Sequence, residues 1–338
     1  METNLDLIGI GECLAELNSV DEESGRGMYQ LGYSGDVLNS LSAAKALGLT
    51  TGLISALGDD PFTDGLVEVL QSEDIDLSHA PILEGKANGA YFIHRDEGGN
   101  PHFHFLRRDS AATYAFSAQP LEDLIRYASS ARAVLFSSIP VAVMKDRNRL
   151  IELVRETHGH AKVCFDLNVR PSLWDNLDAL RELLPVFAPH VDVLFVSAQD
   201  DALLFNHREA AAAVDHYCNM GFTEVAFCRG AQSTLVGLRN PAKMDSTIFE
   251  VPVPRVTSVV DATGAGDAFN AGYIAAMLRG HPPFECAAMG NATAACSLEV
   301  RGGRSTGITI QRVERHYRPL VKWGTFKGPA LAMSRRAN

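Results

Sequence analysis

The stretch best suited to chemistry is a glycine-containing loop that leads into a helix. Residues 261–267 read D-A-T-G-A-G-D, and a helix-forming run follows them as far as Gly280. Gly264 and Gly266 place unpaired backbone N–H groups at the start of this helix, where those donors and the helix dipole together favour an anion. The sequence therefore predicts a phosphate-binding loop at this point.

Asp267, directly after the two glycines, suggests what this loop does. A carboxylate beside a phosphate pocket is repulsive in the ground state, so its presence points to another task, which is to take the proton from a hydroxyl that attacks phosphorus. That is the chemistry of a kinase. The alternative is an Asp that only stabilises the first turn of the helix, and a short G-x-G-D pattern does not separate the two.

Two common nucleotide-binding motifs are missing from the sequence. It contains no G-x-x-x-x-G-K-[ST] run, which excludes a P-loop phosphotransferase. The run G-I-G-E-C-L-A at residues 9–15 lacks the third glycine of a dinucleotide-binding loop, which removes the main dinucleotide-binding alternative.

Composition and charge narrow the class of protein. The 338 residues are 46% hydrophobic and 21% charged, as in ordinary globular proteins, and no apolar run approaches the roughly 18 residues of a membrane span. The N-terminus lacks a basic n-region, so we expect a cytoplasmic protein without a membrane partner. A net charge of −11 argues against nucleic acid as the main partner. Six scattered cysteines favour reduced thiols over a metal or redox site.

Strand-like runs alternate with amphipathic helices through the middle of the chain. These runs are residues 133–137, 162–166, 191–196 and 224–228. Such alternation predicts an α/β fold, with a doubly wound, mainly parallel sheet and helices on both faces. Ligands of such sheets bind beyond the carboxyl ends of the strands. The notable residues that follow these strands are Asn168, Arg170, Asp200, Arg229 and Gly230.

Three other parts of the sequence have recognisable patterns. Residues 35–48 read as an amphipathic helix that leaves Asp36 and Asn39 near its start, available to a ligand. A turn at residues 96–100 separates two further strand-like runs, which are residues 89–94 and 102–106. Residues 315–338 lack clear periodicity and read as a surface tail.

Two motifs that lie far apart in the chain resemble the same family. The run D-A-T-G-A-G-D-A-F from Asp261 is similar to the C-terminal signature of the ribokinase-like (PfkB) carbohydrate kinases. A run from Gly35-Asp36 to Gly58-Asp59, G-D-V-L-N-S-L-S-A-A-K-A-L-G-L-T-T-G-L-I-S-A-L-G-D, is similar to another signature of the family. The run F-D-L-N-V-R-P-S-L-W from Phe165 resembles the 2-keto-3-deoxygluconate kinase branch. Two signatures in the family's order are much more specific than either one alone.

This resemblance covers roughly residues 5–310. It implies a ribokinase-like kinase domain in residues 1–310 and a C-terminal tail in residues 311–338. It also implies a small β-sheet lid, inserted at about residues 12–34 and 88–108. An exposed lid sheet makes a homo-oligomer formed through that sheet plausible.

The resemblance further implies an ATP-dependent kinase for a sugar acid, with Mg²⁺ beside the nucleotide and a monovalent-cation requirement left open. Asp267 would be the base, and the anion hole would consist of Gly264, Ala265, Gly266 and the Asp267 amide. The substrate-binding residues carried over are Gly35, Asp36, Asn39, Tyr91, Arg107, Asn168, Arg170 and Asp267. Those carried over for the nucleotide are Arg229, Gly230, Gly264, Gly266 and Asn291.

Several of these residues have structural alternatives. Arg107 and Arg170 suit a sugar acid because a guanidinium can donate two parallel hydrogen bonds to a carboxylate. Alternatively, Arg107 could be a surface charge, and Arg170 could be a structural arginine that connects two loops. Asn291 could be a helix-packing residue. The N-x-x-E motif that the wider family associates with magnesium is replaced here by S-A-Q-D, so Asp200 could organise water around the metal or merely cap a helix.

Two other functions remain open at this level. A kinase for a neutral ketose such as fructose, or another PfkB sugar kinase, is compatible with the paired signatures, although the arginines disfavour it. A non-catalytic scaffold of the same family is a further alternative, and the intact Asp267 and G-A-G loop argue against it because a scaffold needs no base.

Overall fold

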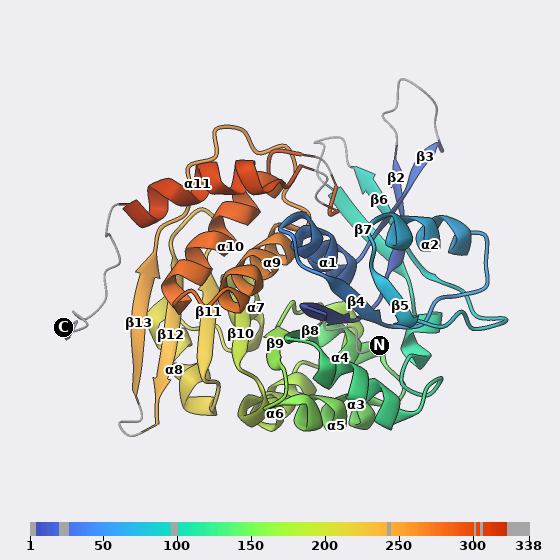
Figure 1. Ribbon diagram of the computed structural model, residues 1–338, viewed down its shortest axis with the longest axis horizontal. Coiled ribbons are helices and arrows are strands. Elements are labelled where there is room, and N and C mark those ends of the chain that lie inside the picture. The colour runs from blue at the N-terminus through green and yellow to red at the C-terminus, as the bar shows by residue number, and fades with distance from the viewer. Residues whose placement is uncertain are drawn as a thin grey trace.

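A computed structural model describes residues 5–19, 27–95, 101–241, 245–300, 302–304 and 307–322 (Figure 1). Nine of the described strands form one sheet in the order β13-β12-β11-β10-β9-β8-β1-β4-β5. These strands are β1 (Leu7–Ile10), β4 (Thr51–Ile54), β5 (Asp76–His79), β8 (Ala133–Ser137), β9 (Lys162–Asp166), β10 (Val193–Ser197), β11 (Glu224–Cys228), β12 (Thr234–Asn240) and β13 (Asp245–Val251). All neighbours from β11 to β5 pair in parallel, whereas β12 pairs antiparallel with both β11 and β13.

Helices cover both faces of this sheet, as Figure 1 shows. One face carries α1 (Asp36–Ala46), α2 (Thr63–Ser72), α9 (Ala265–Leu278), α10 (Pro283–Ser297) and α11 (Ile310–Lys322). The core of the other face includes residues of α3 (Leu121–Ser130), α4 (Ser138–Val143), α5 (Arg147–Thr157), α6 (Asp178–Phe187), α7 (Ala198–Leu204) and α8 (Ala210–Met220). The described residues also form short 3₁₀ turns, which are η1 (Ala111–Tyr114), η2 (Pro171–Leu173) and η3 (Ala188–His190).

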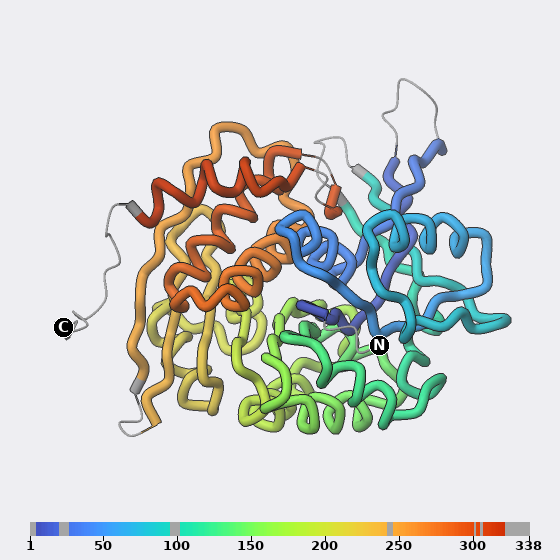
Figure 2. The backbone as a smooth tube through the Cα atoms, in the orientation of Figure 1, coloured from blue at the N-terminus to red at the C-terminus, as the bar shows by residue number. Residues whose placement is uncertain are grey.

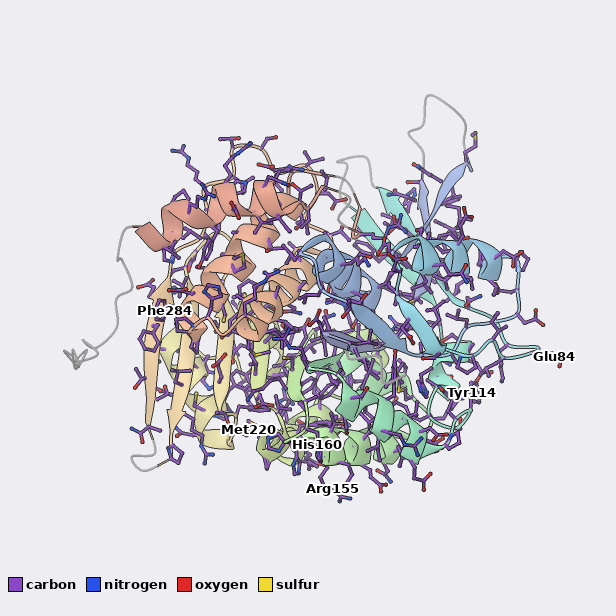
Figure 3. All side chains as sticks on the ribbon, in the orientation of Figure 1. Glu84, Tyr114, Arg155, His160, Met220 and Phe284 are labelled. Atoms are coloured by element: carbon purple, nitrogen blue, oxygen red, sulfur yellow. The ribbon has the colours of Figure 1, made fainter. Side chains whose placement is uncertain are left out.

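Alternation along each strand explains the two apolar cores. In β1, Ile8 and Ile10 belong to the core that includes α3, α5 and α6, whereas Leu7 belongs to the core with α1, α9 and α10. A strand that is buried on both faces must be apolar throughout, which is why the central strands read as continuous hydrophobic runs. Side chains fill the space between the layers in Figure 3. Phe284 of α10, labelled there, packs on Phe249 of β13 with ring centroids 6.0 Å apart.

A second, small sheet stands beside the main body in the order β3-β2-β6-β7. Its strands are β2 (Leu14–Ser19), β3 (Tyr29–Ser34), β6 (Gly89–Arg95) and β7 (Pro101–Leu106). The β2–β3 and β6–β7 pairs are antiparallel, and β2 joins them by pairing in parallel with β6. The predicted α/β architecture, with a mainly parallel sheet, helices on both faces and a separate small sheet, is therefore confirmed.

The prediction that residues 315–338 lack regular structure is wrong for the part that the structure describes. Residues up to 322 belong to α11, which buries Val313 and Leu320 in the core beside α10. Pro319 lies inside this helix, and a proline within a helical pattern usually marks its end. The rest of the tail and the predicted turn at residues 96–100 lie outside the described residues. In the described part of the chain, no helix is both long and apolar enough to span a bilayer.

Candidate active site

The glycine-containing loop forms the start of α9, as predicted. Gly264 is the residue before the helix and has a left-handed backbone with φ of 76°. A Cβ at this position would lie 2.3 Å from the carbonyl oxygen of Gly303, so both backbone conformation and space require glycine. Asp261 stabilises the loop by accepting bonds from the backbone N and hydroxyl of Thr263, at 2.9 and 2.7 Å. The N–H of Ala265, a predicted member of the anion hole, donates to the Ala262 carbonyl oxygen at 3.3 Å. The N–H groups of Gly266 and Asp267 follow it in the first turn, where backbone donors of a helix are available to an anion.

Asp267 lies in the first turn of α9 and is bonded to the start of α1. Asn39 Nδ2 donates to Asp267 Oδ2 over 2.8 Å. Ser34 Oγ in turn donates to Asn39 Oδ1 over 3.0 Å, and both of these side chains are buried. Because the hydroxyl engages the amide oxygen, the amide NH₂ faces the carboxylate. The structure thus brings the two sequence signatures together at one hydrogen bond.

The environment of Asp267 favours a proton acceptor that works near neutral pH. Burial raises the pKa of Asp267 to about 7, and the negative charge of Asp36 acts in the same direction. The hydrogen bond from Asn39 and the positive charge of Arg170 lower the pKa, but they do not outweigh burial. A base with a pKa close to the working pH is both available and strong enough to accept a proton.

A pocket lined by Asp36, Asp166 and Asp267 lies between α1, α9 and the ends of β8 and β9. Ser137 donates to the Asp36 carboxylate, and Asn270 Nδ2 donates to Asp166 Oδ2 over 2.7 Å. Burial raises the pKa of Asp166 well above its usual range, and the nearby charges of other aspartates add to the effect. Neither Asp166 nor Asn270 was predicted from the sequence to belong to the site. Two features of the sequence indicate them: Asp166 stands at the carboxyl end of a strand, and Asn270 follows Asp267 by three residues, so both lie on the same face of the helix.

The two predicted arginines lie in different surroundings. Arg170 is exposed, and its charge reaches Asp267, whose pKa it lowers. Arg107 is 8% exposed and forms an ion pair with Glu12 at 2.6 Å. The surface-charge alternative for Arg107 is therefore wrong. Sequence analysis did not identify Glu12 as its partner.

The remaining predicted substrate residues, Gly35, Tyr91 and Asn168, lie on separate parts of the chain. Gly35, directly before α1, has a φ of 143° that a side chain rarely adopts. Tyr91 is buried in β6, where it donates to the Glu16 carboxylate and stacks on Phe105 at 5.3 Å. Asn168 follows β9 with a positive φ of 33°. Burial and, among smaller contributions, the charge of Asp267 raise the pKa of Tyr91, so Tyr91 lies within electrostatic reach of Asp267.

Two residues predicted to bind the nucleotide have internal partners. Asn291 is buried, accepts a bond from Thr234 Oγ1 at 2.8 Å and donates to the Pro252 carbonyl at 3.0 Å. This supports the helix-packing alternative for Asn291. Arg229 donates to the Ser233 carbonyl at 2.7 Å and thereby closes the β11–β12 turn. Gly230 in that turn has a φ of 61°, and a Cβ added there would meet no other atom within 4 Å.

Asp200, the predicted metal residue, caps a helix. It forms a capping box with Ser197 at the start of α7, and its other carboxylate oxygen accepts a bond from the Val169 backbone N at 2.7 Å. Both oxygens are therefore used within the protein. Among the described residues, no group of three or more His, Cys, Asp or Glu side chains is arranged to hold a metal ion.

Comparisons with known proteins identify the family of this chain. Residues 4–310 match the family described as pfkB family carbohydrate kinase. The 2-dehydro-3-deoxygluconokinase of Escherichia coli strain K12 is 29% identical over 300 residues, which cover 87% of this chain and 94% of that protein. The enzyme of the same name from Thermoproteus tenax is 30% identical over 307 residues, 89% and 90% of the two chains.

The fold is also shared with solved structures. An uncharacterized sugar kinase from Pyrococcus horikoshii, solved in complex with ATP, matches with a TM-score of 0.73 and 25% identity. The match covers 92% of this chain and 99% of that one. The ribokinase-like arrangement of a large α/β body and a small sheet, implied by the sequence resemblance, is therefore the fold observed here.

Proposed function

The chain belongs to the pfkB family of carbohydrate kinases, and we propose that it transfers the γ-phosphoryl group of ATP to 2-keto-3-deoxygluconate, also called 2-dehydro-3-deoxygluconate. The product would be the 6-phosphate. The observation that carries the choice of substrate is that relatives of this name match along nearly the whole chain. The two arginines near the site suit an acid, because an acidic protein needs such groups to hold an anion.

In this proposal Asp267 takes the proton from the terminal hydroxyl while that oxygen attacks the γ-phosphorus. The N–H groups at the start of α9, around Gly264 and Gly266, stabilise the charge on the transferred group. Asn39 holds the Asp267 carboxylate in place through its 2.8 Å hydrogen bond. Since the oxygens of Asp200 are already used, Mg²⁺ would be held mainly by the nucleotide phosphates and water, and it would neutralise charge on them.

A substrate panel tests the proposed substrate. ATP turnover should be measured with 2-keto-3-deoxygluconate, its C4 epimer, fructose and ribose at several concentrations each. We expect the highest kcat/KM with 2-keto-3-deoxygluconate. A higher kcat/KM with fructose would replace the proposal by a neutral-ketose kinase, and no turnover with any sugar would favour the non-catalytic alternative.

The raised pKa of Asp267 predicts how the kinase activity depends on pH. Because a base must be ionised to act, kcat/KM should rise about tenfold per pH unit below pH 7 and level off above about pH 7. Asn39→Ala removes the hydrogen bond that lowers this pKa, so the inflection should move to higher pH. The measurement is a pH–rate profile of both proteins between pH 5.5 and 9. A flat profile in the wild type would rule out Asp267 as a base of this pKa.

We also expect the small sheet to close over a bound sugar, because Arg107 directly follows β7 and Tyr91 of β6 lies within electrostatic reach of Asp267. Closure would exclude water and prevent wasteful ATP hydrolysis. Hydrogen exchange at saturating sugar should slow in β6 and β7, with β12 as an internal reference that stays unchanged. Unaltered exchange in both strands would count against a moving lid.

A further inference from the structure

Four chain segments connect the small sheet with the main body, and they meet around one side chain. The tube in Figure 2 shows the blue and cyan parts of the chain leaving the main body and returning to it. Glu12 lies on the first connection, between β1 and β2. Gly35 follows β3, Gly89 begins β6, and Arg107 follows β7. Each of these three residues comes close to Glu12.

The Glu12 carboxylate bonds to the connection that leaves β7. Its Oε2 lies 2.6 Å from Arg107 Nη2, and its Oε1 accepts a bond from the Ser110 hydroxyl. The side chains of Glu12 and Arg107 are 2% and 7% exposed, so water screens this ion pair very little. A buried charge of either sign is costly without its partner. The pair therefore couples the first and last connections strongly.

The other two connections approach Glu12 so closely that only glycine fits. A Cβ at Gly89 would lie 2.4 Å from Glu12 Oε1. A Cβ at Gly35 would lie 2.4 Å from the backbone oxygen of Glu12, and its φ of 143° already favours glycine. Glu12 thus contacts the chain wherever it passes between the two sheets.

Arg107 keeps donors for a ligand despite this ion pair. A guanidinium carries five N–H donors, and Glu12 takes only one side of it. Arg107 Nη2 and Glu12 Oε2 are close as an ion pair but are not aligned as a hydrogen bond. The Nε of Arg107 is also buried and has no hydrogen-bond partner among the described residues, which is the state of a donor that a bound anion would satisfy.

We propose that Glu12 is a positioning residue of this kinase: its carboxylate orients the Arg107 guanidinium, and with it the small sheet, toward the sugar held at Asp267. This inference rests on the proposed function, in which Arg107 binds the sugar. Glu12 itself touches neither substrate. Its loss should therefore impair binding of the sugar and leave binding of ATP unchanged.

The test compares steady-state constants of Glu12→Gln with those of the wild type, using whichever sugar the substrate panel shows to be turned over fastest. Gln keeps the size and the contact with Ser110 but removes the charge that orients Arg107. We expect KM for the sugar to rise about tenfold, with KM for ATP changed less than about twofold. Glu12→Asp, which restores the charge on a shorter side chain, should recover part of the loss. The matched control is Glu224→Gln, which changes a half-buried carboxylate at the start of β11 that accepts a hydrogen bond from Tyr273.

A double-mutant cycle separates positioning from general damage to the fold. In an Arg107→Gln background, Glu12→Gln should add less than about twofold to the sugar KM, because both changes remove the same interaction. Additive effects, or equal rises in KM for sugar and ATP, would overturn the inference.

If Glu12→Gln does not fold, Ser110→Ala takes its place, with an expected rise of about threefold in sugar KM alone. No rise in sugar KM would overturn the inference as well. A wrong sugar would show in the substrate panel, so the two failures are distinguishable.

Discussion

Asp267→Asn should lower kcat by about 10² to 10⁴, the usual contribution of a general base. Asn has the same size, keeps its place in the first turn of α9 and can still accept the hydrogen bond from Asn39, but it cannot take up the proton. The affinity for ATP should change little, because the backbone N–H groups of the anion site remain. Steady-state kinetics and calorimetric ATP titration measure the two quantities separately.

The control for this variant is Asp64→Asn, which changes an exposed first-turn aspartate of α2. If Asp267 only stabilised its helix, both variants would keep normal turnover. Normal turnover of Asp267→Asn alone would be enough to reject the assignment of the base.

The stability of the same variant should depend on pH in a predictable direction. The folded pKa of Asp267 is about 7, above its ordinary value of 3.8, so the wild type loses stability as the pH rises through this interval, because the carboxyl ionises in the unfolded chain while it stays protonated in the folded protein. Asn has no charge to bury. The melting temperature of Asp267→Asn relative to the wild type should therefore increase from pH 4 to pH 8, which thermal denaturation at a series of pH values measures. A variant that is less stable than the wild type at pH 8 would show that the carboxylate also has a structural role.

Arg170→Ala should reduce kcat/KM for 2-keto-3-deoxygluconate by roughly 30-fold or more, because a charge-assisted pair with the substrate carboxylate is lost. A neutral ketose has no carboxylate, so its turnover should fall much less and the preference for the acid should narrow. Arg126→Ala, at an exposed position on α3, is the matched control. Equal losses for the acid and for fructose would contradict the sugar-acid assignment.

Arg107→Ala is a less specific experiment, for a reason that the structure supplies. Removing Arg107 leaves the Glu12 carboxylate buried without its partner, which commonly costs about 3 to 5 kcal/mol of folding free energy. This variant should therefore lower both sugar use and the melting temperature. Arg170 is exposed, so Arg170→Ala should change sugar use with little change in the melting temperature.

Much of the architecture followed from local patterns in the sequence. The strands predicted at residues 133–137, 162–166 and 224–228 match β8, β9 and β11 to the residue. Such strands are buried on both faces and must be apolar throughout, so they are visible in the sequence wherever polar helix ends separate them. The left-handed Gly264 was visible as well, because glycine is the residue that adopts this backbone without strain.

The partners of the polar residues were decided only by the tertiary structure. Sequence analysis placed Asn39 and Asp267 in two separate signatures, but their hydrogen bond joins residues 228 positions apart. Nothing in the sequence indicated that Arg107 is paired with Glu12 or that both ends of Asn291 are bonded within the fold. Backbone preference and hydrophobic periodicity act between near neighbours in the chain, whereas the burial of a charge and the choice of its partner depend on which distant segments the fold brings together.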